Sequence, residues 1–161
     1  MTKILLSLHV LAAIITIGPV TVAASMFPPA ARRAVVPVPA AAGGGTDAGD
    51  VGTVRLLHRI CRVYAGLGIA VPVLGFATAA AMGVLGDAWL ITSITLTAAA
   101  AGLLIAFVLP RQEELLEQLT DRQPVERART ARLAMFTGLF NLLWATVTVL
   151  MIVRPGSTTG A

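Results

Sequence analysis

The chain has 161 residues and a formal net charge of +4; 57% of its residues are apolar and only 12% are charged. A soluble domain carries about 25% charged residues, so this composition excludes an ordinary water-facing surface. The excess of basic over acidic residues does not indicate binding to nucleic acid, because the arginines lie beside long apolar stretches, where they face lipid headgroups. A single cysteine, Cys61, excludes an internal disulfide.

Four stretches of the chain contain no Asp, Glu, Lys or Arg, and each approaches or exceeds the roughly 20 residues that a helix needs to cross the hydrocarbon core. A helix satisfies its backbone groups internally, as lipid demands. The sequence therefore predicts an all-α polytopic membrane protein, a four-transmembrane-helix bundle forming a single membrane domain over residues 1–161. We expect the helices at about 4–27, 63–85, 90–109 and 133–153.

The first expected helix carries the only ionisable side chain embedded in a span, His9. An intramembrane histidine either forms a hydrogen bond to a Thr or Asn of a neighbouring helix or serves as a ligand for haem or copper. Gly18-Pro19 is expected to bend this helix. As an alternative, Met1–Ala24 has the pattern of a secretory signal. The small or polar stripe predicted to face the bundle is His9, Ala13, Thr16, Val20 and Ala24.

The segment 28–62 is rich in proline, alanine and glycine, including Pro28-Pro29 and Gly43-Gly44-Gly45. It predicts a flexible cytoplasmic loop without a core of its own. Its last part, Arg55–Arg59, is basic and amphipathic, which is typical of a segment that lies along headgroups.

The second, third and fourth expected helices each carry small residues at about four-residue spacing, which lets helix backbones approach closely. We expect these faces to pack inside the bundle. Asn141, an amide in mid-membrane, is interpreted as an interhelical hydrogen-bonding residue or as a substrate contact. The candidate packing residues are Gly75, Ala79, Gly83, Gly138 and Asn141, and the third helix offers Thr95, Ala99, Gly102 and Ala106.

The segment 110–132 balances five arginines with five acidic residues. Its apolar residues Leu115, Leu116 and Leu119 alternate with glutamates in the manner of an amphipathic helix. We expect this cytoplasmic helix to prolong the third span beyond Pro110 and to end before Pro124.

The arginines also predict the orientation of the chain. With four spans, the segments 28–62 and 110–132 lie on one side and hold ten arginines, whereas the other side receives Lys3 and Arg154. Short loops rich in Lys and Arg remain in the cytoplasm. Both termini are therefore expected outside, with Trp89 at the outer boundary and anionic headgroups as the partners of the arginines.

The sequence offers no ordinary enzymatic signature. No Asp or Glu lies within an expected span, and nucleophile, phosphate-loop and paired-carboxylate motifs are missing. We expect a non-enzyme with no catalytic residues and no cofactor. The alternative is a haem or copper site using His9 with Met82 or Met151, which lie at similar depth, whereas His58 lies near the opposite face.

The opening Leu8-His9-Val10-Leu11-Ala12-Ala13, with Gly18-Pro19 and the third-span ending Val108-Leu109-Pro110, resembles a bacterial four-helix integral membrane family, domain of unknown function 2269. The Leu-His start is more distantly similar to copper-resistance D membrane proteins. The resemblance implies a membrane protein without an assigned activity.

The sequence thus predicts a non-enzymatic accessory or scaffolding component of a bacterial plasma membrane. Its partners would be the lipid bilayer and other membrane subunits or a second copy, and not nucleic acid. The first alternative is the haem- or copper-handling protein. The second alternative is a carrier for a small solute, with Pro19, Pro72 and Asn141 near a central cavity.

Overall fold

A computed structural model of the chain describes residues 2–34 and 46–156, with side chains described for 2–34 and 51–156. All regular secondary structure in these ranges is helical, so the predicted all-α class is confirmed. The elements in chain order are α1 (Thr2–Arg33), α2 (Thr46–Leu67), α3 (Ala70–Met82), α4 (Ala88–Leu103), the π-helical turn η1 (Leu104–Val108), α5 (Leu109–Thr120) and α6 (Arg127–Val153).

Four helical spans of the described chain are long and apolar enough to cross a membrane: α1, the α2–α3 segment Val51–Met82, the α4–η1–α5 segment Ala88–Thr120, and α6. The shortest has 27 residues, or about 40 Å of helix against a hydrocarbon core of about 30 Å. Large apolar side chains cover the outside of each span, among them Ile4, Val73, Ile105 and Ile152. The chain is therefore a four-span integral membrane protein.

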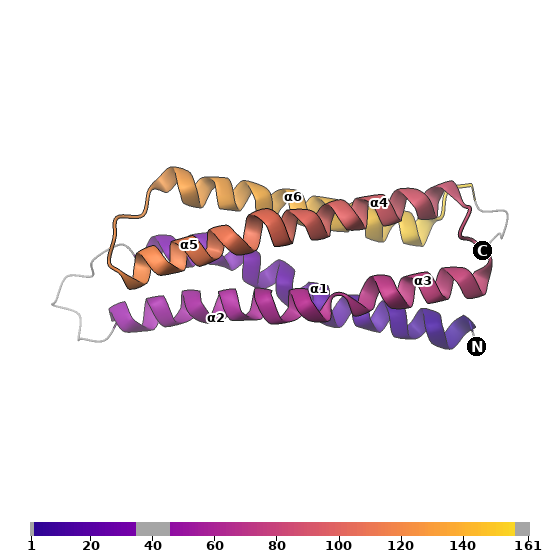
Figure 1. Cartoon of the computed structure of the whole chain (residues 1–161), viewed down its shortest axis with the longest axis horizontal. Helices are drawn as coiled ribbons and strands as arrows, with labels where there is room; N and C mark the ends of the chain where they lie inside the picture. Colours follow the sequence, from indigo (N-terminus) through magenta and orange to yellow (C-terminus); the bar gives the residue numbers. More distant parts are fainter. Residues whose placement is uncertain (1, 35–45, 157–161) are drawn as a thin grey trace.

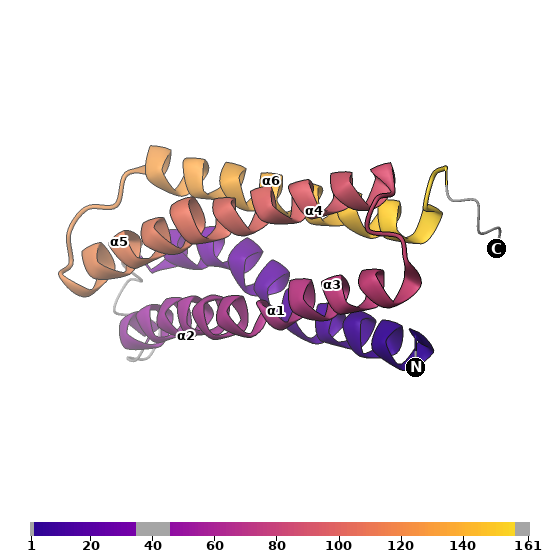
Figure 2. The ribbon, with the colours of Figure 1, turned by 45° about the vertical axis from the view of Figure 1, so that its right-hand side comes forward.

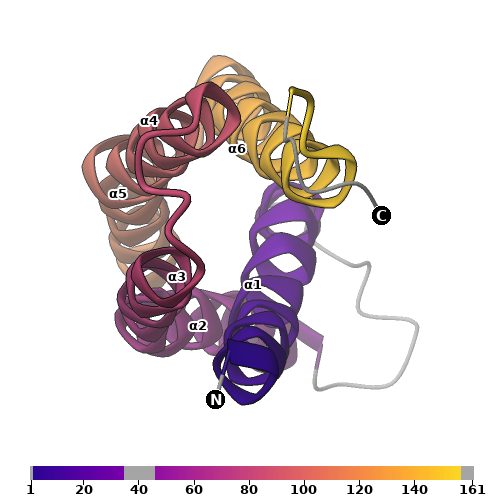
Figure 3. The same ribbon diagram turned by 90° about the vertical axis from the view of Figure 1, so that its right-hand side faces the viewer.

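The spans run alternately up and down, and neighbours in the chain are neighbours in space (Figure 1). Viewed along its length, the bundle is a ring in chain order, with α1 beside both α2–α3 and α6 (Figure 3). α2 contacts α5, and α4 contacts α6. The start of α1, the α3–α4 turn and the end of α6 lie at one end of the molecule, while the α1–α2 and α5–α6 connections lie at the other (Figure 1).

The ten arginines of the two charged segments gather at a single end of this bundle. Arg32 and Arg33 end α1, three more lie along α2 between positions 55 and 62, and the rest belong to α5, to the α5–α6 connection and to the first turns of α6. We call this the arginine end. The opposite end holds Lys3 and Arg154.

The helices extend further than the sequence predicted. The expected flexible loop 28–62 is helical at every described residue except Ala34, which forms a turn: α1 continues through Pro28-Pro29 to Arg33, and α2 begins at Thr46. The glycines 43–45 lie outside the described residues. α2 starts early because Val54, Leu57, His58 and Cys61 recur at helical spacing, and all four are buried in the bundle. Packing against neighbours stabilises a helix that its own composition does not specify.

The second span is broken where a single helix was expected. α2 ends at Leu67 and α3 begins at Ala70, nearly in line (Figure 2). Pro72 has no N–H to offer the carbonyl of Gly68, and the Val71 N–H takes that acceptor at 3.1 Å. The break therefore follows from the proline four residues beyond Gly68.

α1 presents its small and polar stripe to the bundle, as predicted. His9, Thr16, Val20 and Ala24 are all at most 9% exposed. Further along the same face, Ala23, Phe27 and Ala31 join the main core. α1 contacts α2, α3, α5 and α6, so its inner face packs against all three other spans.

The inner faces of α4 and α6 differ from the prediction. The small residues expected inside α4 lie on its exposed side, and so do most of those on α6. The buried residues of α4 are instead Trp89, Leu90, Ser93 and Ala100, so its inner face combines bulky and small side chains. The buried residues of α6 are Thr130, Leu133, Thr137, Phe140 and Val147.

This arrangement of α6 is tested with two leucines of the same helix. Leu133 is 0% exposed and Leu142 is 64% exposed. We expect Leu133→Ala to lower the free energy of unfolding in detergent by about 2 kcal/mol, the order of a leucine-sized cavity, and Leu142→Ala to have little effect. Thermal unfolding followed by circular dichroism measures both. The reverse ranking would contradict the observed inner face.

Candidate functional site

His9 lies in the contact between α1 and α3. Its Nδ1 is 3.0 Å from the carbonyl oxygen of Val71, and the side chain is buried. A carbonyl only accepts, so the ring hydrogen of this bond is on Nδ1, which leaves a lone pair on Nε2. The residue thus uses a backbone partner where a Thr or Asn was expected.

Gly75 makes room for this imidazole. A Cβ atom added to Gly75 would lie 2.8 Å from His9 Cε1 and 3.3 Å from Nδ1. Real Cβ atoms do not approach that closely, so the ring occupies the place that a larger residue would fill. The sequence singled out His9 and Gly75 separately, and the fold brings them together.

The two methionines proposed as partners of His9 lie in the last turns of their helices. Met82 is the final residue of α3, about 10 Å along the helix from Gly75, and Met151 lies near the end of α6. Both are half-buried. Among the described residues, no group of three His, Cys, Asp or Glu side chains could hold a metal ion. The site of His9 with Met82 or Met151 stays a prediction.

Ala79, Gly83 and Trp89 lie where the second span turns into the third. Ala79 is buried against Trp89 and Leu90. Gly83 ends α3 in the left-handed conformation, with φ of 71°, which glycine adopts without steric cost. The Trp89 indole donates to Asp87 Oδ2 at 2.9 Å, so it packs inside the bundle at this end with its polar atom satisfied.

A second polar cluster lies inside the arginine end. Gln112 of α5 is 0% exposed and joins two residues of α2: His58 Nδ1 lies 3.3 Å from its Oε1, and its Nε2 donates to Cys61 Sγ at 3.6 Å. His58 and Cys61 are buried as well. The cluster connects α2 to α5.

Sequence reasoning passed over Gln112, although a signal for it existed. Val108, Gln112, Leu115 and Leu119 recur at spacings of four, three and four, and all four are buried. A polar residue on an otherwise apolar helical stripe needs a partner in the interior. Only the fold identifies His58 and Cys61 as those partners.

A groove of about 230 Å³ runs between α1 and α6, and we call it the α1–α6 groove. Asn141 Nδ2 donates to Ser25 Oγ across it at 3.0 Å. Asn141 Oδ1 and Thr137 Oγ1 are buried without a hydrogen-bond partner. Pro19 and Pro72 do not line this groove, and a carrier with both prolines and Asn141 around one central cavity stays a prediction. Its lining residues are Ser25, Pro28, Pro29, Arg32, Ala134, Thr137, Gly138 and Asn141.

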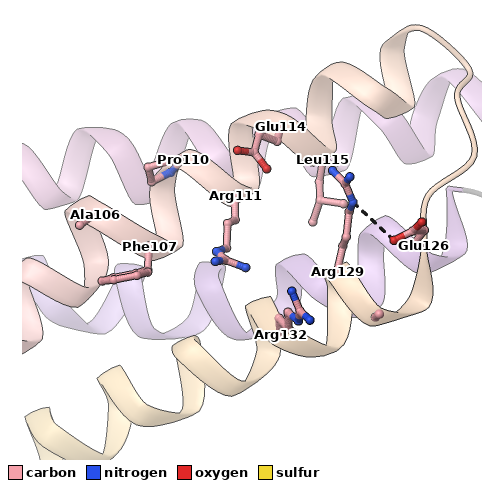
Figure 4. Close-up of a pocket in the computed structure, with 10 residues that line it drawn as sticks. Ala106, Phe107, Pro110, Arg111, Glu114, Leu115, Glu126, Arg129 and Arg132 are labelled. Carbon is pink, nitrogen blue, oxygen red and sulfur yellow. Dashed lines mark ion pairs between the residues drawn. The ribbon is translucent and has the colours of Figure 1, made fainter.

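A larger cleft of about 500 Å³ lies between the third span and α6 at the arginine end, and we call it the arginine cleft (Figure 4). Arg111 reaches into it from α5, and Arg129 and Arg132 reach into it from α6. Arg129 Nε pairs with Glu126 Oε2 at 3.7 Å. The remaining lining residues are Ala106, Phe107, Pro110, Glu114, Leu115 and Ala128.

Pro110 explains the shape of this cleft. It cannot donate to the carbonyl of Ala106, and the chain widens into the π-turn η1, in which the Leu109 N–H bonds the Leu104 carbonyl. The Phe107 and Phe136 rings are stacked with centroids 5.1 Å apart. The Arg111 guanidinium lies over Phe136, 4.8 Å from its centroid. The π-turn that precedes Pro110 therefore contains Phe107, whose ring stacks on Phe136 beneath the Arg111 guanidinium.

Comparison with protein-family models, with curated proteins and with solved structures finds no match to this chain. No family is therefore assigned. The resemblance to domain of unknown function 2269 and to copper-resistance D proteins is not supported beyond the class itself. The fold and the span composition define the class as four-span helical membrane proteins.

The fit between His9 and Gly75 predicts a specific steric effect. We expect Gly75→Ala to lower the free energy of unfolding by about 1–3 kcal/mol, because the added Cβ must displace the ring from Val71. Gly66→Ala is the matched control, since a Cβ there meets no atom within 4 Å. In a His9→Ala background the Gly75→Ala penalty should disappear. An unchanged penalty would contradict the contact.

The buried amide predicts a different pattern. Gln112→Leu leaves the His58 N–H without its acceptor, and we expect a loss of about 1–3 kcal/mol in detergent. Adding His58→Leu should recover part of that loss, because both polar partners are then removed together. Exposed Gln123→Leu serves as the control. Thermal unfolding of the wild type and of these three variants distinguishes a hydrogen-bonded pair from general packing. If the two side chains only filled space, adding His58→Leu would lower the free energy of unfolding further.

Proposed function

We propose that this protein is a non-catalytic accessory component of a bacterial plasma membrane that docks a transmembrane helix of another subunit. The arginine end lies in the cytoplasm in this proposal, with both termini outside. The observation that carries the docking role is the outward small-residue face of α4.

Support for this role comes first from the interior polar groups. His9 is engaged with Val71, and Asn141 with Ser25. The buried Gln112 is shared by His58 and Cys61. These side chains hold helices together through their hydrogen bonds, which favours a structural role over an enzymatic one.

The docking face is Thr95, Ala99, Gly102 and Ala106, at spacings of four, three and four along α4 and η1. All four are exposed. Small residues at this spacing let a second helix approach closely and gain van der Waals contact that lipid tails do not match. None of the four is buried in the bundle, so the face is available to another transmembrane helix, and only Ala106 among them also lines the arginine cleft.

The docking role is tested with two glycines. A Cβ at Gly102 or at Gly66 meets no atom within 4 Å, and both glycines are exposed, so we expect a leucine at either position to be accommodated without a change in the bundle. We expect Gly102→Leu to abolish co-purification of the partner in mild detergent, and Gly66→Leu, on α2, to retain it. Quantitative mass spectrometry and molecular mass by light scattering provide the readout. A wild-type protein that purifies alone, or equal binding by both variants, would overturn the role, and a pure homodimer would replace it by self-association.

The orientation has its own experiment. In a Cys61→Ala background, we expect a cysteine at Gly86 to react with a membrane-impermeant thiol reagent in intact cells. A cysteine at Gln123 should react only after permeabilisation. Both positions are exposed and lie at opposite ends of the bundle, and ten arginines against two basic residues set the expected sidedness. The opposite labelling pattern would reverse the topology.

A second candidate function uses His9. Donation from Nδ1 to the Val71 carbonyl fixes the tautomer in which Nε2 can accept or bind a metal. This is the arrangement that a haem or copper ligand requires. The purified protein would then show a Soret band or stoichiometric copper that His9→Ala removes. Absence of both in protein from cells supplied with haem and copper would end this candidate.

A further inference from the structure

We propose that the arginine cleft binds the phosphate headgroup of an anionic phospholipid, with Arg111, Arg129 and Arg132 as its ligands. The proposal goes beyond the docking of a helix to α4. It depends on the orientation only for the leaflet from which the lipid comes.

Charge favours an anion here. Three arginines and two glutamates line the cleft, an excess of one positive charge. Glu126 is paired with Arg129, and within the part of the chain that the structure describes, Arg111 and Arg132 form no ion pair. Two guanidinium groups from two helices therefore face the cleft without a carboxylate partner. Their forked N–H groups match the oxygens of a phosphate.

Arg111 is also held in place before a ligand arrives. Its guanidinium lies 4.8 Å from the Phe136 centroid, and that ring stacks on Phe107. A guanidinium lying over an aromatic face keeps its N–H edge available for hydrogen bonds. Less conformational freedom is then lost on binding, so the stack favours a defined site over diffuse surface attraction.

The apolar wall distinguishes a lipid from a soluble phosphate. The cleft lies at Pro110, where the uncharged stretch of the third span ends, and Arg111 is the first charged residue of α5. On the apolar side it is bounded by Ala106 and Phe107, and neighbouring Ile105 is 62% exposed. A phosphate among the arginines would place acyl chains along this surface. Basic pockets between helices at the cytoplasmic face bind anionic headgroups in this way.

The test uses the full chain in nanodiscs of phosphatidylcholine with a small fraction of phosphatidylglycerol, and native mass spectrometry to count retained lipid. We expect the Arg111→Gln/Arg132→Gln double variant to bind phosphatidylglycerol about tenfold or more weakly than wild type. The control is Arg55→Gln/Arg59→Gln, which removes two exposed charges from α2 at the same end. It should bind as wild type does. Equal losses in both double variants would reduce the effect to general surface charge and overturn the site.

Two further arms complete the test. Phe136→Leu keeps every charge but removes the ring beneath Arg111, and it should weaken retention while the control does not. Glycerophosphate added to purely phosphatidylcholine nanodiscs should not bind at millimolar concentration. Arginine-dependent binding of glycerophosphate with an affinity equal to that of the lipid would overturn the lipid in favour of a soluble anion. Thermal unfolding of each variant confirms that it is folded. If the double variant does not fold, the retention of phosphatidylglycerol by the Arg132→Gln single variant is compared with that of the control.

This experiment is independent of the docking proposal. Both leaflets of the nanodisc have the same composition, so a reversed topology leaves lipid binding unchanged. The docking face is unaltered in every variant, and the Gly102→Leu protein should retain phosphatidylglycerol as wild type does. Failure of one proposal therefore leaves the other intact.

Discussion

Hydrocarbon offers no hydrogen-bond partner, and the structure of this chain is organised by where its polar groups find partners inside the protein. The backbone meets this requirement by being helical. Side-chain hydroxyls meet it locally: Thr16, Thr78 and Thr97 each bond the carbonyl four residues earlier on their own helix, at 2.6–2.7 Å. Other polar side chains connect different helices. His9, Gln112 and Asn141 are the main examples, and each joins two helices at a defined place.

Prolines create the irregular places of the bundle. Each one removes a donor from its own helix, and the chain responds differently in each case. Pro72 lies just after a break between α2 and α3, close to the carbonyl that His9 bonds. Pro110 produces the π-turn beside the arginine cleft. Pro28 and Pro29 continue within α1 and line the α1–α6 groove. The features with functional interest therefore lie where a regular helix is interrupted or left without a donor.

The two ends of the bundle are built on different physical principles. The end near Trp89 is held by a compact contact in which the indole bonds Asp87 and the Arg154 guanidinium lies 5.7 Å from the ring centroid. The arginine end carries many more charges, yet the described residues there contain one ion pair, between Arg129 and Glu126. Cations left unpaired at the edge of a membrane span are free to contact headgroups. This asymmetry underlies both the proposed orientation and the proposed lipid site.

Composition and the spacing of charges were sufficient to predict the all-α class, the four spans and the gathering of ten arginines at one end, because transfer into lipid depends on the content of each segment and not on its neighbours. The inner stripe of α1 followed from the same periodicity. Which faces of α4 and α6 turn inward did not follow, since these helices are apolar on every side and only the positions of the neighbouring helices decide which face is buried. Likewise, the pairing of His9 with Gly75, and of Gln112 with His58 and Cys61, joins residues that are more than fifty positions apart. Those contacts are decided by the tertiary structure, because the arrangement of the helices alone determines which polar group meets which partner.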